Sequence, residues 1–195
     1  MTKLSKSDLL PYEQYKNMYP KFLNEVIEEK KKRRVTINDK MTGLFESKLT
    51  VFYQIQEMIR AEQITDGDYI NEMLDVYNDL LPDKNELSMT LFIEIPDQEE
   101  LRKFNKTIVG IEKHVQIVFG DNVVTSYEPD NEDEDDEHYT QSVHYLHFPF
   151  DDSSKNDFLS DNGKIFLRIN HQNYKSETVL PAVTVNELKK QLMAE

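Results

Sequence analysis

The sequence predicts an α+β fold with a mixed or largely antiparallel sheet packed against a central helix at about 45–64. Apolar residues at helical spacing predict an N-terminal, a central and a C-terminal helix, and alternating apolar and polar residues mark strands between them. From residue 87 onward the expected order is strand, helix, strand and strand. The 195 residues include no linker-like stretch and no internal repeat, so we expect a single domain, 1–195.

The N-terminal helix is expected from about 11 to 32. Its apolar side chains recur every three or four residues from Tyr12 to Ile27. Pro20 interrupts this run, so we expect a kink or a junction between two helices there. The basic cluster at 30–34 is interpreted as a solvated last turn, because positive charge complements the C-terminal end of a helix dipole. The alternative is a patch that binds an anion or a partner, including the acidic segment of this chain.

The central helix follows two short expected strands, at 35–37 and 41–45. In a helical projection its apolar residues cover an arc wider than one amphipathic face, so we expect neighbours on more than one side. Gln56 and Glu62 fall within this arc, whereas Glu57 falls on the wetter side. The apolar residues of the arc are Leu49, Val51, Phe52, Ile55, Met58 and Ile59.

An inward Glu62 has to be paired, hydrogen-bonded or protonated, because burying a lone carboxylate costs several kcal/mol. One interpretation is a structural ion pair, for example with Arg60, or a position at the rim of the helix end. The other is a polar pocket for a ligand or a metal, lined by Gln56, Glu57, Arg60 and Glu62.

The remaining elements follow from turn signals and periodicity. Helix-start signals at 65–68, 97 and 151–154 predict three further helices, and 185–192 predicts the C-terminal one. Strands are expected at 87–95, 115–119, 123–124, 139–150, 165–169 and 174–179, the last two paired. The segment at about 128–138 is expected to be an exposed acidic loop, because eight acidic side chains within Glu128–Glu137 repel one another.

Composition excludes several classes of function. The absence of cysteine excludes disulfides, a catalytic thiol and thiolate metal sites, and a net charge of −14 argues against nucleic acid and anionic membranes as partners. No apolar run is long enough to span a bilayer and the start lacks a signal-peptide core, so we expect a cytoplasmic protein. Phosphate-binding glycine loops, a nucleophile elbow and an HExxH zinc motif are also missing.

Three histidines are candidates for chemistry. His144 and His147 lie three residues apart on an expected strand, which puts them on opposite faces and prevents them from sharing a metal. His144 shares a face with Leu146, and His171 ends the strand at 165–169. They are interpreted as structural histidines, or alternatively as ligands that meet Glu57 or Glu62 and hold a first-row metal ion.

The chain resembles a family of uncharacterised bacterial proteins, the domain of unknown function 3501 family. The resemblance covers nearly the whole chain and rests on LSKSDLLPYEQY, EEKKKRRV, LFESKLTVFYQIQEMIRAEQI, YNDLLPD, LFIEIPD, SVHYLHF and NHQNY. Gln54, Gln56, Glu57, Met58, Arg60 and Glu62 match the family pattern in the central helix, and NHQNY contains His171 and Tyr174, whereas His147 stands where relatives carry Arg. The resemblance implies an α+β cytosolic protein, and its gene neighbourhoods suggest a redox or oxidative-stress pathway.

Two functions follow as hypotheses. The first is a soluble accessory or interaction protein with a protein partner, such as a rubrerythrin-like or iron–sulfur protein, and with no cofactor of its own. The second is a ligand-binding or metal-dependent enzyme. Its pocket candidates are Gln56, Glu57, Arg60, Glu62, His144, His171 and Tyr174, and Glu62, His144 and His171 are the candidate metal ligands.

Overall fold

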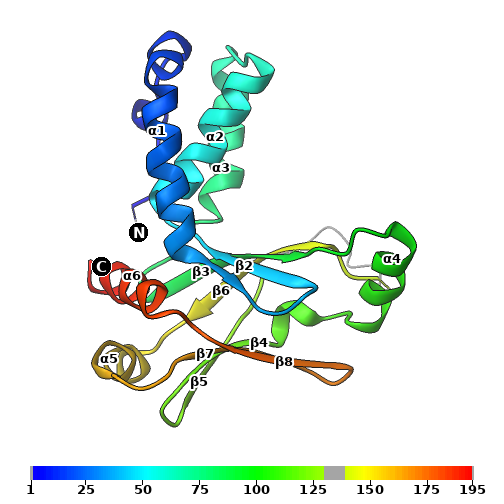
Figure 1. The fold of residues 1–195 in the computed structure, drawn as a ribbon. Coiled ribbons are helices and arrows are strands. Elements are labelled where there is room, and N and C mark those ends of the chain that lie inside the picture. The colour runs from blue at the N-terminus through cyan, green and yellow to red at the C-terminus, as the bar shows by residue number, and fades with distance from the viewer. Residues whose placement is uncertain (1, 130–138, 195) are drawn as a thin grey trace.

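Two four-stranded antiparallel sheets form the base of the fold, and three long helices project from it as an arm (Figure 1). The computed structural model describes residues 2–129 and 139–194. The predicted α+β class and the antiparallel pairing are confirmed, but the strands form two sheets rather than one. Most of the predicted acidic loop, 130–138, lies outside the described residues.

The first sheet has the order β1-β2-β3-β6. Its strands are β1 (Arg34–Thr36), β2 (Met41–Phe45), β3 (Glu86–Ile93) and β6 (Val143–Pro149). Leu87, Met89 and Leu91 alternate along β3 on the face toward the main core, opposite Phe148, Leu146 and His144 of β6. The other face of β3 carries Glu86, Ser88 and Thr90, and these polar side chains are also buried. The strand is therefore covered on both faces, one apolar and one polar.

The second sheet has the order β5-β4-β7-β8. Its strands are β4 (Val115–Phe119), β5 (Asn122–Thr125), β7 (Phe166–His171) and β8 (Tyr174–Val179), and β7 and β8 pair as predicted. A bridge between Tyr127 and His147 links the chain after β5 to β6 of the first sheet. The inward faces of both sheets form one apolar core, to which α5 (Asp152–Ser160) and α6 (Ala182–Met193) add Phe158, Leu188 and Leu192.

The arm consists of α1 (Tyr12–Arg33), α2 (Lys48–Glu62) and α3 (Gly67–Asn78). Pro20 lies within α1 without dividing it into two helices. α2 begins at Lys48 rather than at about residue 45, because Ser47 caps it and Phe45 still belongs to β2. The arm has an apolar core separate from that of the sheets, formed by Leu4, Val51, Ile55, Ile59, Met73, Leu74, Leu80 and Leu81.

Shorter helices complete the chain. They are the 3₁₀ turns η1 (Lys6–Asp8) and η2 (Ile111–Lys113), and the α-helix α4 (Gln98–Thr107). The predicted caps are confirmed, since Asp66, Asp97 and Asp151 each accept a backbone N–H in the first turn of the following helix. Within the described residues, no helix combines the length and the apolar character needed to cross a membrane.

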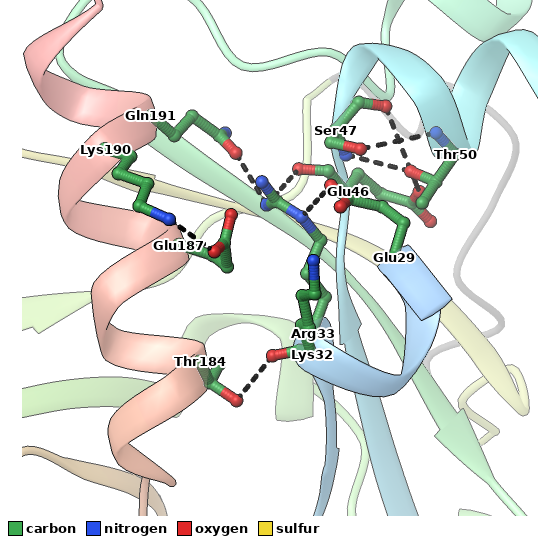
Figure 2. Close-up of polar contacts among 10 residues, drawn as sticks. All are labelled: Glu29, Lys32, Arg33, Glu46, Ser47, Thr50, Thr184, Glu187, Lys190 and Gln191. Carbon is green, nitrogen blue, oxygen red and sulfur yellow. Dashed lines mark hydrogen bonds and ion pairs between the residues drawn. The ribbon is translucent and has the colours of Figure 1, made fainter. Parts of the chain in front are cut away.

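Arg33 joins the arm to the rest of the protein (Figure 2). Its guanidinium donates from Nε to Glu29 in α1 at 2.6 Å and from Nη1 to Gln191 in α6 at 2.7 Å. The same Nη1 lies 3.4 Å from the backbone oxygen of Glu46, between β2 and α2. The interpretation of the basic cluster as a solvated turn is therefore wrong for Arg33, which is buried. Thr184 supports this junction by donating to the Lys32 carbonyl at 2.7 Å.

Arg33→Met should lower the free energy of unfolding by about 3 kcal/mol, because it leaves the largely buried Glu29 carboxylate and Gln191 without their donor. Lys31→Met is the matched control, since Lys31 forms only an exposed pair with Glu28 and should cost less than about 1 kcal/mol. Urea unfolding of both variants measures the difference. Equal losses would show that Arg33 has no special role.

Candidate functional site

Gln56 is buried as the helical projection predicted, but its partner is backbone. Its Oε1 accepts from Leu10 N at 2.9 Å, and its Nε2 donates to Leu10 O at 2.9 Å. Both ends of the amide are therefore used to anchor the segment before α1 against α2. The side chain has a structural partner rather than a free polar end.

Glu57 and Arg60 form an ion pair on the side of α2 that faces α1. Arg60 donates to both carboxylate oxygens at 3.0 and 2.9 Å, and Tyr15 donates to Oε1 at 2.6 Å. Burial opposes the ionised form of Glu57, but the hydrogen bonds from Arg60 and Tyr15 prevail and lower its pKa. Arg60 also lies over the ring of Tyr19, 4.9 Å from the centroid. This cluster ties α1 to α2.

The expectation that Glu62 points inward is wrong, because this residue is exposed. Glu62 is the last residue of α2, and the chain turns away at Gln63, which has a φ of 52°. The helical projection assumes that neighbouring elements cover every turn of the helix. At its final turn that assumption fails.

His144 and His147 lie on opposite faces of β6, as predicted, and both are buried. His144 Nδ1 lies 3.0 Å from Glu128, and its Nε2 lies 3.1 Å from the Gln141 carbonyl. His147 Nδ1 lies 3.1 Å from Glu86, and its Nε2 lies 2.9 Å from the Asp79 carbonyl. All four ring nitrogens are thus used within the protein. Glu128, expected in the exposed loop, instead pairs with His144, and its side chain is only 7% exposed.

His171 and Tyr174 belong to the second sheet, away from the central helix. His171 donates from Nε2 to the Val109 carbonyl at 3.0 Å and accepts at Nδ1 from Asn173 N at 3.2 Å. Tyr174 packs edge-on against Phe104, with the ring centroids 5.1 Å apart. The structure does not bring the seven candidates together. Throughout 2–129 and 139–194, no three His, Asp or Glu side chains gather closely enough to hold a metal ion.

The structure contains a pocket of about 500 Å³ where the arm meets the first sheet. It is lined by Gln54 of α2, Val76 and Tyr77 of α3, Asp79 and Leu80 after α3, Glu128 and Pro129, and Tyr145 of β6. Leu80 and Tyr145 also border a tightly packed region that leaves no room for a water molecule. The other residues of that region include Glu46, Ser88, Thr90 and His147. A buried polar layer therefore adjoins an open pocket.

Glu46 is the most unusual residue of this layer. Its carboxyl is buried and lies within hydrogen-bond distance of the Thr90 hydroxyl at 2.6 Å, of the Thr50 hydroxyl, and of Gln54 Nε2 at 3.4 Å. No Lys, Arg or His of the described chain forms an ion pair with it, and Arg33 contacts only its backbone oxygen. Burial outweighs the hydrogen bonds and raises the pKa of Glu46. Such a carboxyl next to a pocket is a candidate for proton transfer or ligand binding.

Glu46 is not among the predicted site residues because it lies at the junction of a strand and a helix. The helical projection treated Phe45 onward as helix, which hid the change of direction at Ser47. A weaker signal was present in β3, where Glu86, Ser88 and Thr90 alternate with apolar residues. That pattern is normally produced by a solvated face, and only the tertiary structure shows that the arm covers it.

Glu46→Gln should become more stable than the wild type as pH rises above the ordinary carboxyl pKa of about 4.3. The reason is that burial raises the folded-state pKa of Glu46, so ionisation favours the unfolded chain.

Glu86→Gln should show the opposite dependence on pH, becoming less stable than the wild type as pH rises. Burial opposes ionisation of Glu86, but His147 and Tyr127 lower its pKa, so its stabilisation is present at neutral pH and lost in acid. Urea unfolding across pH tests both, and a shift in the same direction for the two variants would contradict this assignment.

The comparisons with known proteins define the family. The model of the family described as "Protein of unknown function (DUF3501)" matches residues 3–192. A crystal structure of a novel protein of unknown function from Burkholderia pseudomallei is 30% identical, with a TM-score of 0.89, and the match covers 98% of this chain and 100% of that one. No curated protein matches. The chain belongs to the DUF3501 family.

Proposed function

We propose that the protein binds a small organic molecule in the pocket between α2, α3 and β6. The observation that carries this proposal is the juxtaposition of a pocket of about 500 Å³ with a buried carboxyl that forms no ion pair with any described residue. Gln54 connects the two, because its side chain lines the pocket and its Nε2 donates to Glu46. This site differs in its residues from the pocket that the sequence suggested, although both lie on the central helix.

The composition of the walls suits a ligand of modest size. Pockets of about 300 to 1,000 Å³ are typical of small-molecule sites, which combine apolar walls with a few polar groups. Val76 and Leu80 supply aliphatic surface, Tyr77 and Tyr145 supply rings with hydroxyl groups, and Gln54 supplies an amide. The site lies where the helical arm meets the first sheet, and Glu128 and Pro129 of the segment after β5 complete its lining.

The energetic cost of Glu46 also favours a function at this place. A buried carboxyl without a cation destabilises the folded state when it ionises, and an apolar or amide side chain would avoid that cost. Residues that lower stability are retained where activity needs them. The polar layer behind the pocket fits this pattern.

A role in binding a protein partner is the second candidate. The arm projects from the sheets (Figure 1), and it carries the exposed apolar side chains Met18, Tyr69 and Val76. The gene neighbourhoods implied by the family resemblance point to a rubrerythrin-like or iron–sulfur protein. If that role holds, a purified protein of this kind co-elutes with the wild-type chain in gel filtration and fails to co-elute with Met18→Asp.

A tryptophan placed at the pocket tests the small-molecule proposal directly. The chain contains no tryptophan, so Val76→Trp adds a unique fluorophore at the rim of the pocket. In a screen of small amines, carboxylates and diols, a pocket ligand should change the emission of this variant. The same compound should bind the variant about tenfold more weakly than the wild type, because the indole fills part of the site.

Val183→Trp is the matched control, since Val183 is also an exposed valine on a helix but lies on α6, outside the pocket lining. Its emission should not respond to the same compound. A screen in which neither variant responds, or in which both respond equally, would overturn the assignment of the pocket as a binding site.

A further inference from the structure

The described residues that line the pocket include negatively charged side chains but no positively charged ones. Asp79 and Glu128 are carboxylates, and none of the lining residues within 2–129 and 139–194 is Lys, Arg or His. Glu128 is held by His144 at 3.0 Å and by the Tyr145 amide at 2.7 Å, whereas the Asp79 side chain is open to solvent and 3.8 Å from Lys3 at the surface. An anionic ligand would find no partner for its charge in these walls.

The uncharged lining residues also favour a cation. Tyr77 and Tyr145 contribute aromatic rings to the lining, and aromatic rings attract ammonium and guanidinium groups more strongly when the cation is partly desolvated. The carbonyl of Gln54 can accept an N–H, because the Nε2 end of its amide is occupied by Glu46 and by the Thr50 carbonyl. An ammonium group bonded to the Gln54 carbonyl would be separated from the Glu46 carboxyl only by the side-chain amide of Gln54.

The hydrogen bonds around Glu46 indicate that its carboxyl carries a proton. Thr50 Oγ1 accepts from the Ser47 amide at 2.8 Å and faces two acceptors, Glu46 Oε2 and the Ser47 carbonyl, the latter at 3.0 Å. One hydroxyl proton cannot serve both acceptors. If Glu46 donates from Oε2 to Thr50, the Thr50 proton serves the Ser47 carbonyl and all these contacts are satisfied.

None of the described charged groups near Glu46 forms an ion pair with its carboxyl, so none of them requires the carboxyl to be ionised. From α1, Lys30 acts on Glu46 only through space, and its Nζ lies over the ring of Tyr53 at 4.9 Å. Arg33, also from α1, bonds the Glu46 carbonyl rather than the carboxyl. From β6, Tyr145 and His147 border the same packed region as Glu46, and His147 is already bonded to Glu86 and to the Asp79 carbonyl.

We propose that the ligand of this pocket is a small organic cation, an amine or guanidine, and that Glu46 releases its proton when the cation binds. This inference rests on the proposed small-molecule function and names its ligand class. The positive charge stabilises the Glu46 carboxylate across the Gln54 amide, the proton leaves to solvent, and the Thr50 hydroxyl turns to donate to Oε2. No covalent bond of the ligand is made or broken.

Isothermal titration calorimetry with three chain-matched probes tests this proposal. Cadaverine, glutarate and pentanediol share a five-carbon chain and differ in charge. At neutral pH cadaverine should bind the wild-type protein, and the other two should not. The binding heat for cadaverine should differ between phosphate and Tris buffers, because the released proton is taken up by buffers with different ionisation enthalpies.

Variants separate the two parts of the proposal. Glu46→Gln should bind cadaverine with the same heat in both buffers, because it has no proton to release. Gln54→Leu should weaken binding about tenfold, because it removes the amide between ligand and carboxyl. Glu62→Gln removes an exposed carboxylate from the same helix, outside the pocket lining, and should behave like the wild type in affinity and in proton release.

Cadaverine binding to the wild type with no buffer dependence would overturn the proposed proton release. Tighter binding of glutarate or pentanediol would overturn the cationic ligand class and leave the small-molecule function standing. If none of the probes binds and the emission of Val76→Trp responds to no compound, the inference and the proposed function both fail.

Discussion

The buried guanidinium of Arg33 is the interaction on which the arrangement of this protein depends. A charged group inside a protein has to find hydrogen-bond acceptors, and Arg33 finds them on α1, on α6 and at the junction of β2 and α2. These elements lie far apart in the sequence, so the guanidinium sets the position of the arm relative to the sheets. It also holds the backbone of Glu46, which places the carboxyl of that residue next to the pocket.

The contact between the arm and the first sheet is polar. Thr90 donates to Glu46 just before α2, Ser88 donates to the Leu80 carbonyl just after α3 at 2.6 Å, and His147 Nε2 lies 2.9 Å from the Asp79 carbonyl at the end of α3. The apolar residues are divided instead into two separate clusters, one between the sheets and one within the arm. The pocket lies beside this hydrogen-bonded junction and shares Leu80 and Tyr145 with it.

The carboxyls of Glu46, Glu57 and Glu86 have different roles because their surroundings differ. Glu57 and Glu86 are bonded to cationic or phenolic donors, which lower the pKa of each against the effect of burial. The described hydrogen-bond partners of the Glu46 carboxyl are hydroxyl and amide groups, so burial prevails and its pKa rises. The first two stabilise the fold through their charge. Glu46 is suited to exchanging a proton, at some cost to stability.

Much of this fold could be predicted from the sequence, because periodicity and capping are local. The alternation along β3, the caps at Asp97 and Asp151 and the inward position of Gln56 all depend on residues a few positions away. The projection could not identify the partner of Gln56, which is the Leu10 backbone, 46 residues away. It also failed for Glu62, because a helix end is exposed or covered according to its neighbours in space.

The sequence by itself determined the class of the fold, most of the helices and strands, and the absence of thiol chemistry. Only the tertiary structure decided which polar residues meet. Arg33 and Gln191 are 158 positions apart, and Glu46 and Thr90 are 44 apart, distances over which no local pattern carries information. The site could not be read from the chain for this reason: hydrogen bonds between distant segments form only once packing has brought those segments together.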